Sequence, residues 1–219
     1  PGSLQNYVHE GARGIRLLLK ERTFLTRQLY AVLRAAQGVP CQVRIMLPMV
    51  AFLEDIIDFR TVFDEVKRKF EKEHGKAAKI AVGVMIETPA ACVMSDVFSQ
   101  YADFFSLGTN DLARFSLAVE RSEELGDLFY QPAVLRLVKK TAELSRVPVS
   151  ICGEAASYPG ICVILAGFGI RDFSMNPASV PLIEKALQQL TMKQMKELSE
   201  KALKCVDASS LRGLLFDHG

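Results

Sequence analysis

Two carboxylates, Glu87 and Asp111, lie 24 residues apart, and each follows a short apolar stretch typical of a β-strand. That spacing is about one strand–helix unit, so adjacent parallel strands would bring both carboxylates to one edge of a sheet. Two close carboxylates share a proton or bind a cation, and Mg²⁺ commonly takes one or two carboxylates together with substrate oxygens and water. Either residue alone would fit a contact with a helix N-terminus. The pair favours a metal site.

Cys152 ends a third apolar stretch and is followed by Gly153 and Glu154. A thiol normally keeps its proton at neutral pH, so Cys152 could act as an acid; a buried structural cysteine is the alternative. Asn110 lies next to Asp111 in a strand-to-helix turn. The backbone N–H groups of such a turn can bind an anion, although a simple tight turn explains the same residues.

Three arginines, Arg13, Arg44 and Arg121, stand near these segments. A guanidinium can bind a phosphate or a carboxylate through two parallel hydrogen bonds. Ordinary surface salt bridges are the alternative for each of them.

The elements that must position these residues alternate between strands and helices along the chain. The sequence predicts strands at 44–48, 80–86, 104–107, 149–152 and 172–175. The stretch 80–86 is apolar throughout, as in a parallel sheet covered by helices. Such a sheet is either doubly wound or closed into a barrel. Because no glycine-rich nucleotide-binding loop follows a strand, and polar residues follow three consecutive strands, we expect the (β/α)₈ barrel type.

Helical periodicity and capping signals fill the intervals between the predicted strands. An apolar stripe predicts a helix that Gly75 ends, formed by Phe52, Ile56, Phe59, Phe63, Val66 and Phe70. Thr88 and Pro89 predict a helix start, and Thr191 with Gln194 predicts a capping box. Further helices are expected from Asn110, from Pro132 to about Ser145, near Pro159 and around Ser179.

The composition excludes several classes of protein. The 219 residues are 49% hydrophobic and 24% charged, which predicts a globular chain that we expect to form one domain, 1–219. With 27 basic and 25 acidic residues, the chain has no charge excess for nucleic acid or an anionic membrane. The longest apolar run, 161–170, is too short to span a bilayer. Five cysteines without a CxxC pair, and no secretory signal, predict a cytoplasmic protein.

Six segments together resemble the phosphoenolpyruvate-utilising enzymes, and most closely the phosphoenolpyruvate–protein phosphotransferases, enzyme I of the bacterial sugar phosphotransferase system. The segments are Gly14–Arg16, Arg44–Met49, Gly83–Ala91, Phe104–Leu112, Leu117–Arg121 and Cys152–Glu154. The resemblance covers about 11–190, and 191–219 are expected to form C-terminal helices.

The resemblance implies a (β/α)₈ barrel that binds phosphoenolpyruvate and Mg²⁺ in the first step of phosphotransferase sugar uptake. It implies that Glu87 and Asp111 hold the metal and that Cys152 exchanges a proton with C3 of the enolate as pyruvate forms. It also implies four substrate-binding residues, namely Arg13, Arg44, Asn110 and Arg121. The implied partners are an upstream phosphohistidine domain, a phosphocarrier protein and a second copy of the chain in a homodimer.

The sequence also departs from the family pattern. The family passes the phosphoryl group to a histidine on a separate domain, and none of the three histidines of this chain matches that motif. We expect the first two barrel strands to be missing, which leaves an open sheet of five or six parallel strands. We expect this chain to be inactive without the missing segments. Tyr7 and Val8 replace Asn-Pro, Glu120 replaces aspartate, the segment 129–135 is about three residues short, and Ser157 and Tyr158 replace Gly-Asp.

These departures keep other functions open. One alternative is a pyruvate phosphate dikinase or a phosphoenolpyruvate synthase, and another is a metal-dependent pyruvate aldolase. The aldolases share the Glu and Asp spacing but do not need the segment Cys152–Glu154. A non-catalytic regulatory module is a third alternative.

Overall fold

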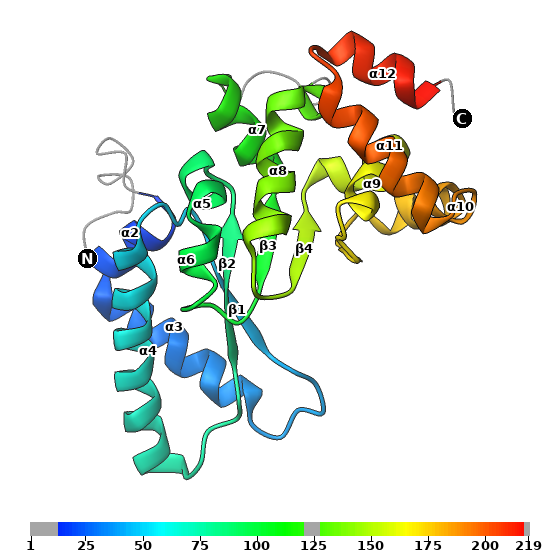
Figure 1. Ribbon diagram of the computed structural model, residues 1–219. Coiled ribbons are helices and arrows are strands. Elements are labelled where there is room, and N and C mark those ends of the chain that lie inside the picture. Colours follow the sequence, from blue (N-terminus) through cyan, green and yellow to red (C-terminus); the bar gives the residue numbers. More distant parts are fainter. Residues whose placement is uncertain (1–12, 121–127, 217–219) are drawn as a thin grey trace.

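The computed structural model describes residues 13–120 and 128–216, in which short parallel strands alternate with helices (Figure 1). The strands are β1 (Arg44–Leu47), β2 (Ala81–Ile86), β3 (Phe105–Gly108), β4 (Val149–Cys152) and β5 (Asp172–Phe173). The α-helices are α2 (Ile15–Lys20), α3 (Arg22–Ala36), α4 (Leu53–His74), α5 (Pro89–Val93), α6 (Ser95–Phe98), α7 (Thr109–Leu117), α8 (Pro132–Leu144), α9 (Pro159–Gly167), α10 (Val180–Gln188), α11 (Met192–Lys204) and α12 (Ala208–Phe216). Three short 3₁₀ turns are η1 (Leu128–Tyr130), η2 (Glu154–Ser157) and η3 (Pro177–Ser179).

The five strands lie in the sheet in the same order as in the chain, β1-β2-β3-β4-β5, and every neighbouring pair is parallel. A doubly wound sheet would reverse its strand order at a switch point, whereas successive right-handed crossovers that never reverse place their helices on one face. The predicted α/β class with a parallel sheet is therefore confirmed, and these strands show no doubly wound order. Figure 1 shows α5, α6 and α8 against the central strands.

The two faces of the sheet differ in chemistry. Alternate strand residues are fully buried beneath the helices: Val84, Ile86, Phe105, Leu107 and Ile151. The other face carries Met46 and Met85 together with small or polar residues: Arg44, Gly83, Ser106, Ser150 and Asp172. Only one face of the sheet therefore belongs to the helix-covered core.

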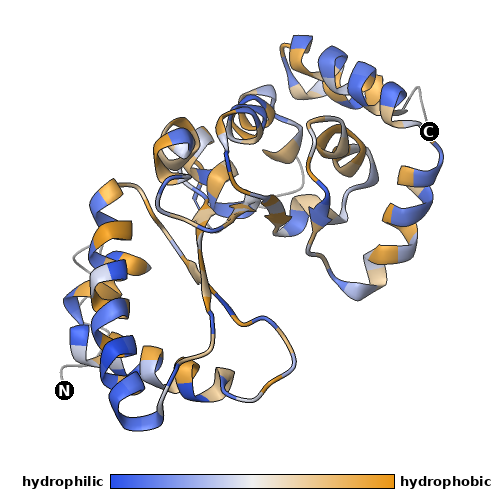
Figure 2. Ribbon diagram, turned by 60° about the horizontal axis from the view of Figure 1, so that its bottom comes forward, coloured by the Kyte–Doolittle hydropathy of each residue, from blue (hydrophilic) through white to orange (hydrophobic). Residues whose placement is uncertain are grey.

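Helix α4 confirms most of the predicted apolar stripe. Ile56, Phe59, Phe63, Val66 and Phe70 are all buried, and Figure 2 shows hydrophilic and hydrophobic residues mixed along the helix, as expected for one buried face. The inclusion of Phe52 was wrong.

Phe52 is 56% exposed because it is the residue before α4, with an extended backbone that takes its ring off the helical stripe. Its ring lies beneath the guanidinium of Arg16, 5.6 Å away. Gly75 follows the last residue of α4 with a φ of 78°, as its type predicts.

The other predicted elements are present with small shifts at their ends. Thr88 caps α5 by accepting from the Ala91 N–H, and Thr191 and Gln194 form the predicted capping box of α11. Helix α7 begins at Thr109 rather than Asn110, and β5 is shorter than predicted. Within the described ranges, the helices are too short or too polar to cross a bilayer.

Candidate functional site

The carboxyl ends of β2, β3 and β4 lie at one edge of the sheet, where α7 follows β3 (Figure 1). Glu87 comes directly after β2, Asn110 and Asp111 lie in the first turn of α7 directly after β3, and Cys152 is the last residue of β4. Gly108 of β3 pairs with Cys152, so neighbouring strands end at nearly the same level. Three of the sequence-predicted segments are thus brought together.

Glu87 fills the space between the loop after β1 and the end of β3. Its side chain is 5% exposed, and its Oε1 accepts a hydrogen bond of 2.6 Å from the backbone N–H of Met49. Its Oε2 faces Gly108, where an added Cβ would lie 3.0 Å from that oxygen. A glycine at 108 therefore leaves room for the carboxylate.

The turns after β3 and β4 are joined by hydrogen bonds. The Thr109 hydroxyl donates to the Cys152 carbonyl at 3.0 Å, and the Glu154 N–H donates to Asn110 Oδ1 at 2.9 Å. Gly153 has a φ of 96°, and a Cβ there would lie 2.6 Å from the Thr109 hydroxyl oxygen. Only glycine at position 153 lets the two turns come this close. The turns therefore hold Asn110 and Cys152 at a fixed spacing.

The thiol of Cys152 is half-buried and donates to the Leu107 carbonyl at 3.3 Å. Burial raises the pKa of this thiol, the negative charge of Glu87 raises it further, and a hydrogen bond with Ser106 acts in the opposite direction. The thiol therefore carries its proton at neutral pH, which is the state that an acid needs.

Arg13 approaches the same edge from the N-terminal side of the described chain. Its guanidinium lies over the ring of Phe115, 4.8 Å from the ring centroid. Phe115 is four residues after Asp111 on α7, so the two side chains share one face of that helix. The structure thus brings Arg13 to the helix that carries Asn110 and Asp111.

The structure does not bring Arg44 to this edge. Arg44 is the first residue of β1 and pairs with Ala81, the first residue of β2, so it lies at the opposite end of the sheet, three residues or about 10 Å from the end of its strand. Its guanidinium hydrogen-bonds the side chain of Gln42 and lies 5.4 Å from the centre of the Phe104 ring. Arg44 therefore lies away from the other site residues in this structure, and its contact with the substrate stays a prediction of the resemblance. Arg121 lies outside the described residues.

The donor set at this edge suits Mg²⁺ in one specific way. In the described ranges, no three His, Cys, Asp or Glu side chains gather closely enough to hold a metal by themselves. Mg²⁺ needs fewer protein ligands, because one or two carboxylates with substrate phosphate oxygens and water complete its octahedron. Glu87, directly after β2, and Asp111, in the first turn of α7, are the two carboxylates that could hold it.

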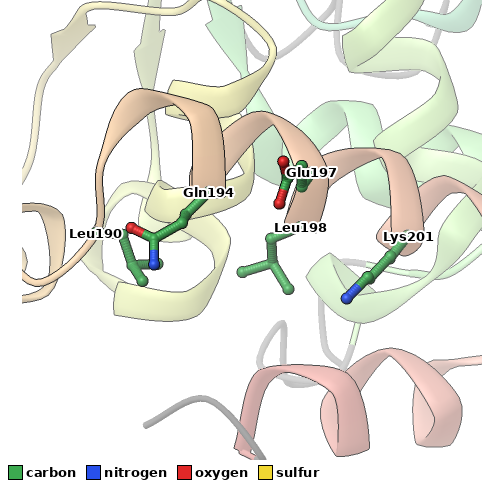
Figure 3. Close-up of a pocket in the computed structure, with 5 residues that line it drawn as sticks. All are labelled: Leu190, Gln194, Glu197, Leu198 and Lys201. Atoms are coloured by element: carbon green, nitrogen blue, oxygen red, sulfur yellow. The ribbon is translucent and has the colours of Figure 1, made fainter.

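A separate hollow of about 210 Å³ lies along α11 (Figure 3). Its lining residues are Leu190, Gln194, Glu197, Leu198 and Lys201. None of them belongs to the polar edge. The hollow is therefore not part of the candidate site.

Sequence reasoning missed the residues that hold the site together. Met49 turns the chain after β1 with a φ of 59°, and Thr109 and Gly153 join two turns that lie 44 positions apart. Gly153 next to Cys152 was a usable signal, because a glycine after a strand often marks close approach. Met49 offers no such signal, since methionine rarely adopts this conformation.

Comparison with known proteins identifies relatives over nearly the whole chain. The family described as "PEP-utilising enzyme, PEP-binding domain" matches residues 9–192. A phosphoenolpyruvate–protein phosphotransferase of Staphylococcus carnosus is 34% identical over 95% of this chain and 37% of its own length. A multiphosphoryl transfer protein of Xanthomonas campestris is 35% identical over 93% of this chain and 24% of its own length. The chain thus spans between about a quarter and two fifths of the length of these curated relatives.

Among solved structures, a citrate lyase from Burkholderia xenovorans aligns with a TM-score of 0.55 at 18% identity. The alignment covers 88% of this chain and 66% of that one. At this identity the likeness concerns the fold alone.

Proposed function

Since the chain belongs to the family of PEP-utilising enzymes, as a PEP-binding domain, we propose that it binds phosphoenolpyruvate at the polar edge of its sheet. We propose further that the bound phosphoryl group passes to a histidine on a separate domain, as in a phosphoenolpyruvate–protein phosphotransferase. The observation that carries the proposal is the meeting of Glu87, Asn110 with Asp111, and Cys152 at the ends of three consecutive strands. Reactive groups of parallel α/β sheets gather at this end.

In the proposed reaction, Cys152 acts as the general acid. The bond between phosphorus and the enol oxygen breaks, the phosphoryl group joins a histidine nitrogen, and the bonding electron pair stays with the enolate. Carbon C3 of the enolate then takes the thiol proton of Cys152 to give pyruvate, and the thiolate regains a proton from solvent. The raised pKa of Cys152 suits this part, because the thiol holds its proton until the enolate forms.

The substrate's negative charge would be met by residues on both sides of the edge. Arg13 and Arg121 are proposed to bind the phosphate and the carboxylate, and Asn110 is proposed to donate to a phosphate oxygen. Glu87 and Asp111 would hold Mg²⁺, which when bound offsets the charge of the phosphate and of the enolate oxygen. A contact of Arg44 with the substrate is implied by the resemblance alone, since its guanidinium lies near the start of β1.

The same proposal extends to the fold and the partners. The unreversed strand order and the polar second face of the sheet favour an incomplete (β/α)₈ barrel. One main hydrophobic cluster runs from Ile15 to Leu211, which favours a single domain that includes α11 and α12. We propose a phosphohistidine domain, a phosphocarrier protein and a second copy of the chain as partners. Five free thiols fit a reducing cytoplasm.

Calorimetric titration with phosphoenolpyruvate, in Mg²⁺ and in EDTA, tests the proposal. We expect binding to be tighter with Mg²⁺, and we expect Asp111→Ala to abolish that difference because one of the two carboxylates is lost. Asp64→Ala, which removes an exposed carboxylate on α4, is the matched control and should behave like the parent. Equal affinity of the parent in both buffers would remove the metal from the proposal.

A non-catalytic binding module is the second candidate, and one observation favours it. Tyr158, which replaces a smaller family residue, packs its ring against Phe129 at 5.7 Å and Tyr130 at 6.1 Å. The residue has thus taken a packing role in the turn that follows Cys152. A parent protein that binds no phosphoenolpyruvate in either buffer would favour this candidate.

A further inference from the structure

The loop after β1 is held from the side of β2 by two consecutive residues. The Glu87 carboxylate accepts from the Met49 N–H at 2.6 Å, and the Thr88 hydroxyl donates to the Val50 carbonyl at 3.1 Å. Met49 and Val50 are buried, and Met49 holds a positive φ that its side chain disfavours. A conformation of this kind persists only where its surroundings enforce it.

The other side of this loop supports the segment that carries Arg13. The Ile15 N–H donates to the Pro48 carbonyl at 3.0 Å. Gly14, with a φ of 62°, lies so close that an added Cβ would stand 2.5 Å from the Cβ of Met49. Arg13 therefore starts from a backbone that rests directly on the Pro48–Met49 turn.

We propose that Glu87 is a positioning residue for Arg13, in addition to its proposed place beside the metal. The contacts run from Glu87 Oε1 to the Met49 N–H, from the Pro48–Met49 turn to Gly14 and Ile15, and so to Arg13. The two carboxylate oxygens divide the tasks, because Oε1 accepts from Met49 while Oε2 faces Gly108. The ligand of Arg13 rests on the proposed function. The positioning of Arg13 by Glu87 does not depend on it.

The proposal separates the charge of Glu87 from its hydrogen-bond acceptor. Glutamine keeps an acceptor oxygen at nearly the same place and loses the charge, so Glu87→Gln should keep Arg13 in position. Leucine has a similar volume and no acceptor, so Glu87→Leu leaves the buried Met49 N–H unsatisfied. Because the two effects are separable, metal binding and Arg13 positioning need not be lost together.

Hydrogen exchange at single amides, followed by NMR, tests the positioning directly and needs no ligand. In Glu87→Leu we expect the Met49 and Ile15 amides to exchange at least about tenfold faster than in the parent. In Glu87→Gln we expect both rates to stay within about twofold of the parent. Asp111→Asn removes a carboxylate charge from the same edge and leaves the Met49 acceptor in place, so it is the control.

Phosphoenolpyruvate binding in EDTA adds a second readout. We expect the affinity of Glu87→Leu to be at least about fivefold below that of Glu87→Gln, because both variants lose the carboxylate charge and only glutamine keeps the acceptor that positions Arg13. If Glu87→Leu fails to fold by circular dichroism, Gly14→Ala moves the same segment from its other side. It should speed exchange at Ile15 and lower the affinity in EDTA.

The outcomes distinguish this inference from the proposed function. Unchanged exchange at Met49 and Ile15 in Glu87→Leu, or at Ile15 in Gly14→Ala when it stands in, would overturn the positioning role. Equally fast exchange in Glu87→Gln and Glu87→Leu would show that charge and not the acceptor matters, which also overturns it. A parent that binds no phosphoenolpyruvate would contradict the proposed function, and the exchange rates would still decide the role of Glu87.

Discussion

Cys152 combines a raised pKa with a position at the end of β4, between the Leu107 carbonyl and the carboxylate of Glu87. Serine has nearly the same shape but holds its proton far more tightly. In a protein that also carries the upstream barrel strands and phosphohistidine domain, we therefore expect Cys152→Ser to bind phosphoenolpyruvate like the parent and to exchange the methyl hydrogens of pyruvate with D₂O at least about 100-fold more slowly. The exchange is followed by proton NMR in the presence of Mg²⁺. Because the pKa is raised, an exchange that needs the protonated thiol should persist above the pH at which an ordinary thiol ionises.

Cys41→Ser removes an exposed thiol that precedes β1 and serves as the control for this experiment. It should exchange at the parent rate. If Cys152→Ser exchanges as fast as the parent, Cys152 is a structural residue and the pyruvate aldolase alternative gains support.

Single residues also show how far sequence reasoning reached into the site. Glu87, Asp111 and Cys152 were predicted to meet because each follows an apolar stretch, and strand ends of a parallel sheet share an edge. The substrate contact of Arg44 stays a prediction of the resemblance, because the predicted strand 44–48 begins at this residue and the structure likewise places it at the start of β1. The role of Met49 in the turn after β1 could not be predicted, since it depends on a hydrogen bond to a carboxylate 38 positions away.

Among the elements, α9 and α11 pack closely because Gly167 has no side chain. A Cβ at this position would lie 2.4 Å from the Met195 carbonyl oxygen and 2.6 Å from the Ser199 hydroxyl oxygen. The Met195 carbonyl oxygen belongs to the backbone and cannot move alone, so the whole of α11 would have to shift. We expect Gly167→Ala to lower the free energy of unfolding by about 1–3 kcal/mol, measured by urea denaturation.

Gly213 offers the matched control in α12. No atom lies within 4 Å of the place where its Cβ would be. Alanine is a better helix former than glycine, so Gly213→Ala should raise the stability by about 0.5–1 kcal/mol. Two Gly→Ala changes with equal effects would mean that α9 and α11 do not pack as closely as described.

The elements were easier to predict than their ends. The alternation of strands and helices follows from the period of apolar residues, and that pattern spans many residues in each element. The ends depend on single contacts. Phe52 was assigned to the apolar stripe of α4 although it precedes the helix, since periodicity alone does not show where a helix begins.

For the whole molecule, the order of strands is the property that the sequence left open. A doubly wound sheet and a barrel-type sheet share the same alternation of elements, and only pairing between distant segments separates them. The parallel registers of β1 through β5 supply that information. Closure into a barrel with further strands is part of the proposed fold.

Two buried thiols link the stability of the whole molecule to alkaline pH. Burial raises the pKa of Cys92 from 9.0 to about 11 and that of Cys162 from 9.0 to about 12. Between pH 9 and about 11 the unfolded chain has lost these protons while the folded chain keeps them. The unfolded state then binds fewer protons, so the free energy of unfolding falls as pH rises, by up to about 1.4 kcal/mol per pH unit for each thiol.

Urea denaturation of the parent, Cys92→Ala and Cys162→Ala at a series of pH values from 7 to about 10.5 measures this effect. Each alanine variant should be less stable than the parent at pH 7, because a buried side chain is shortened. Above pH 9 each should lose stability less steeply than the parent, because one of the two ionising thiols is gone. Parallel curves for all three proteins would mean that the thiols ionise equally in the folded and unfolded chain, and would contradict the burial of Cys92 in α5 and of Cys162 in α9.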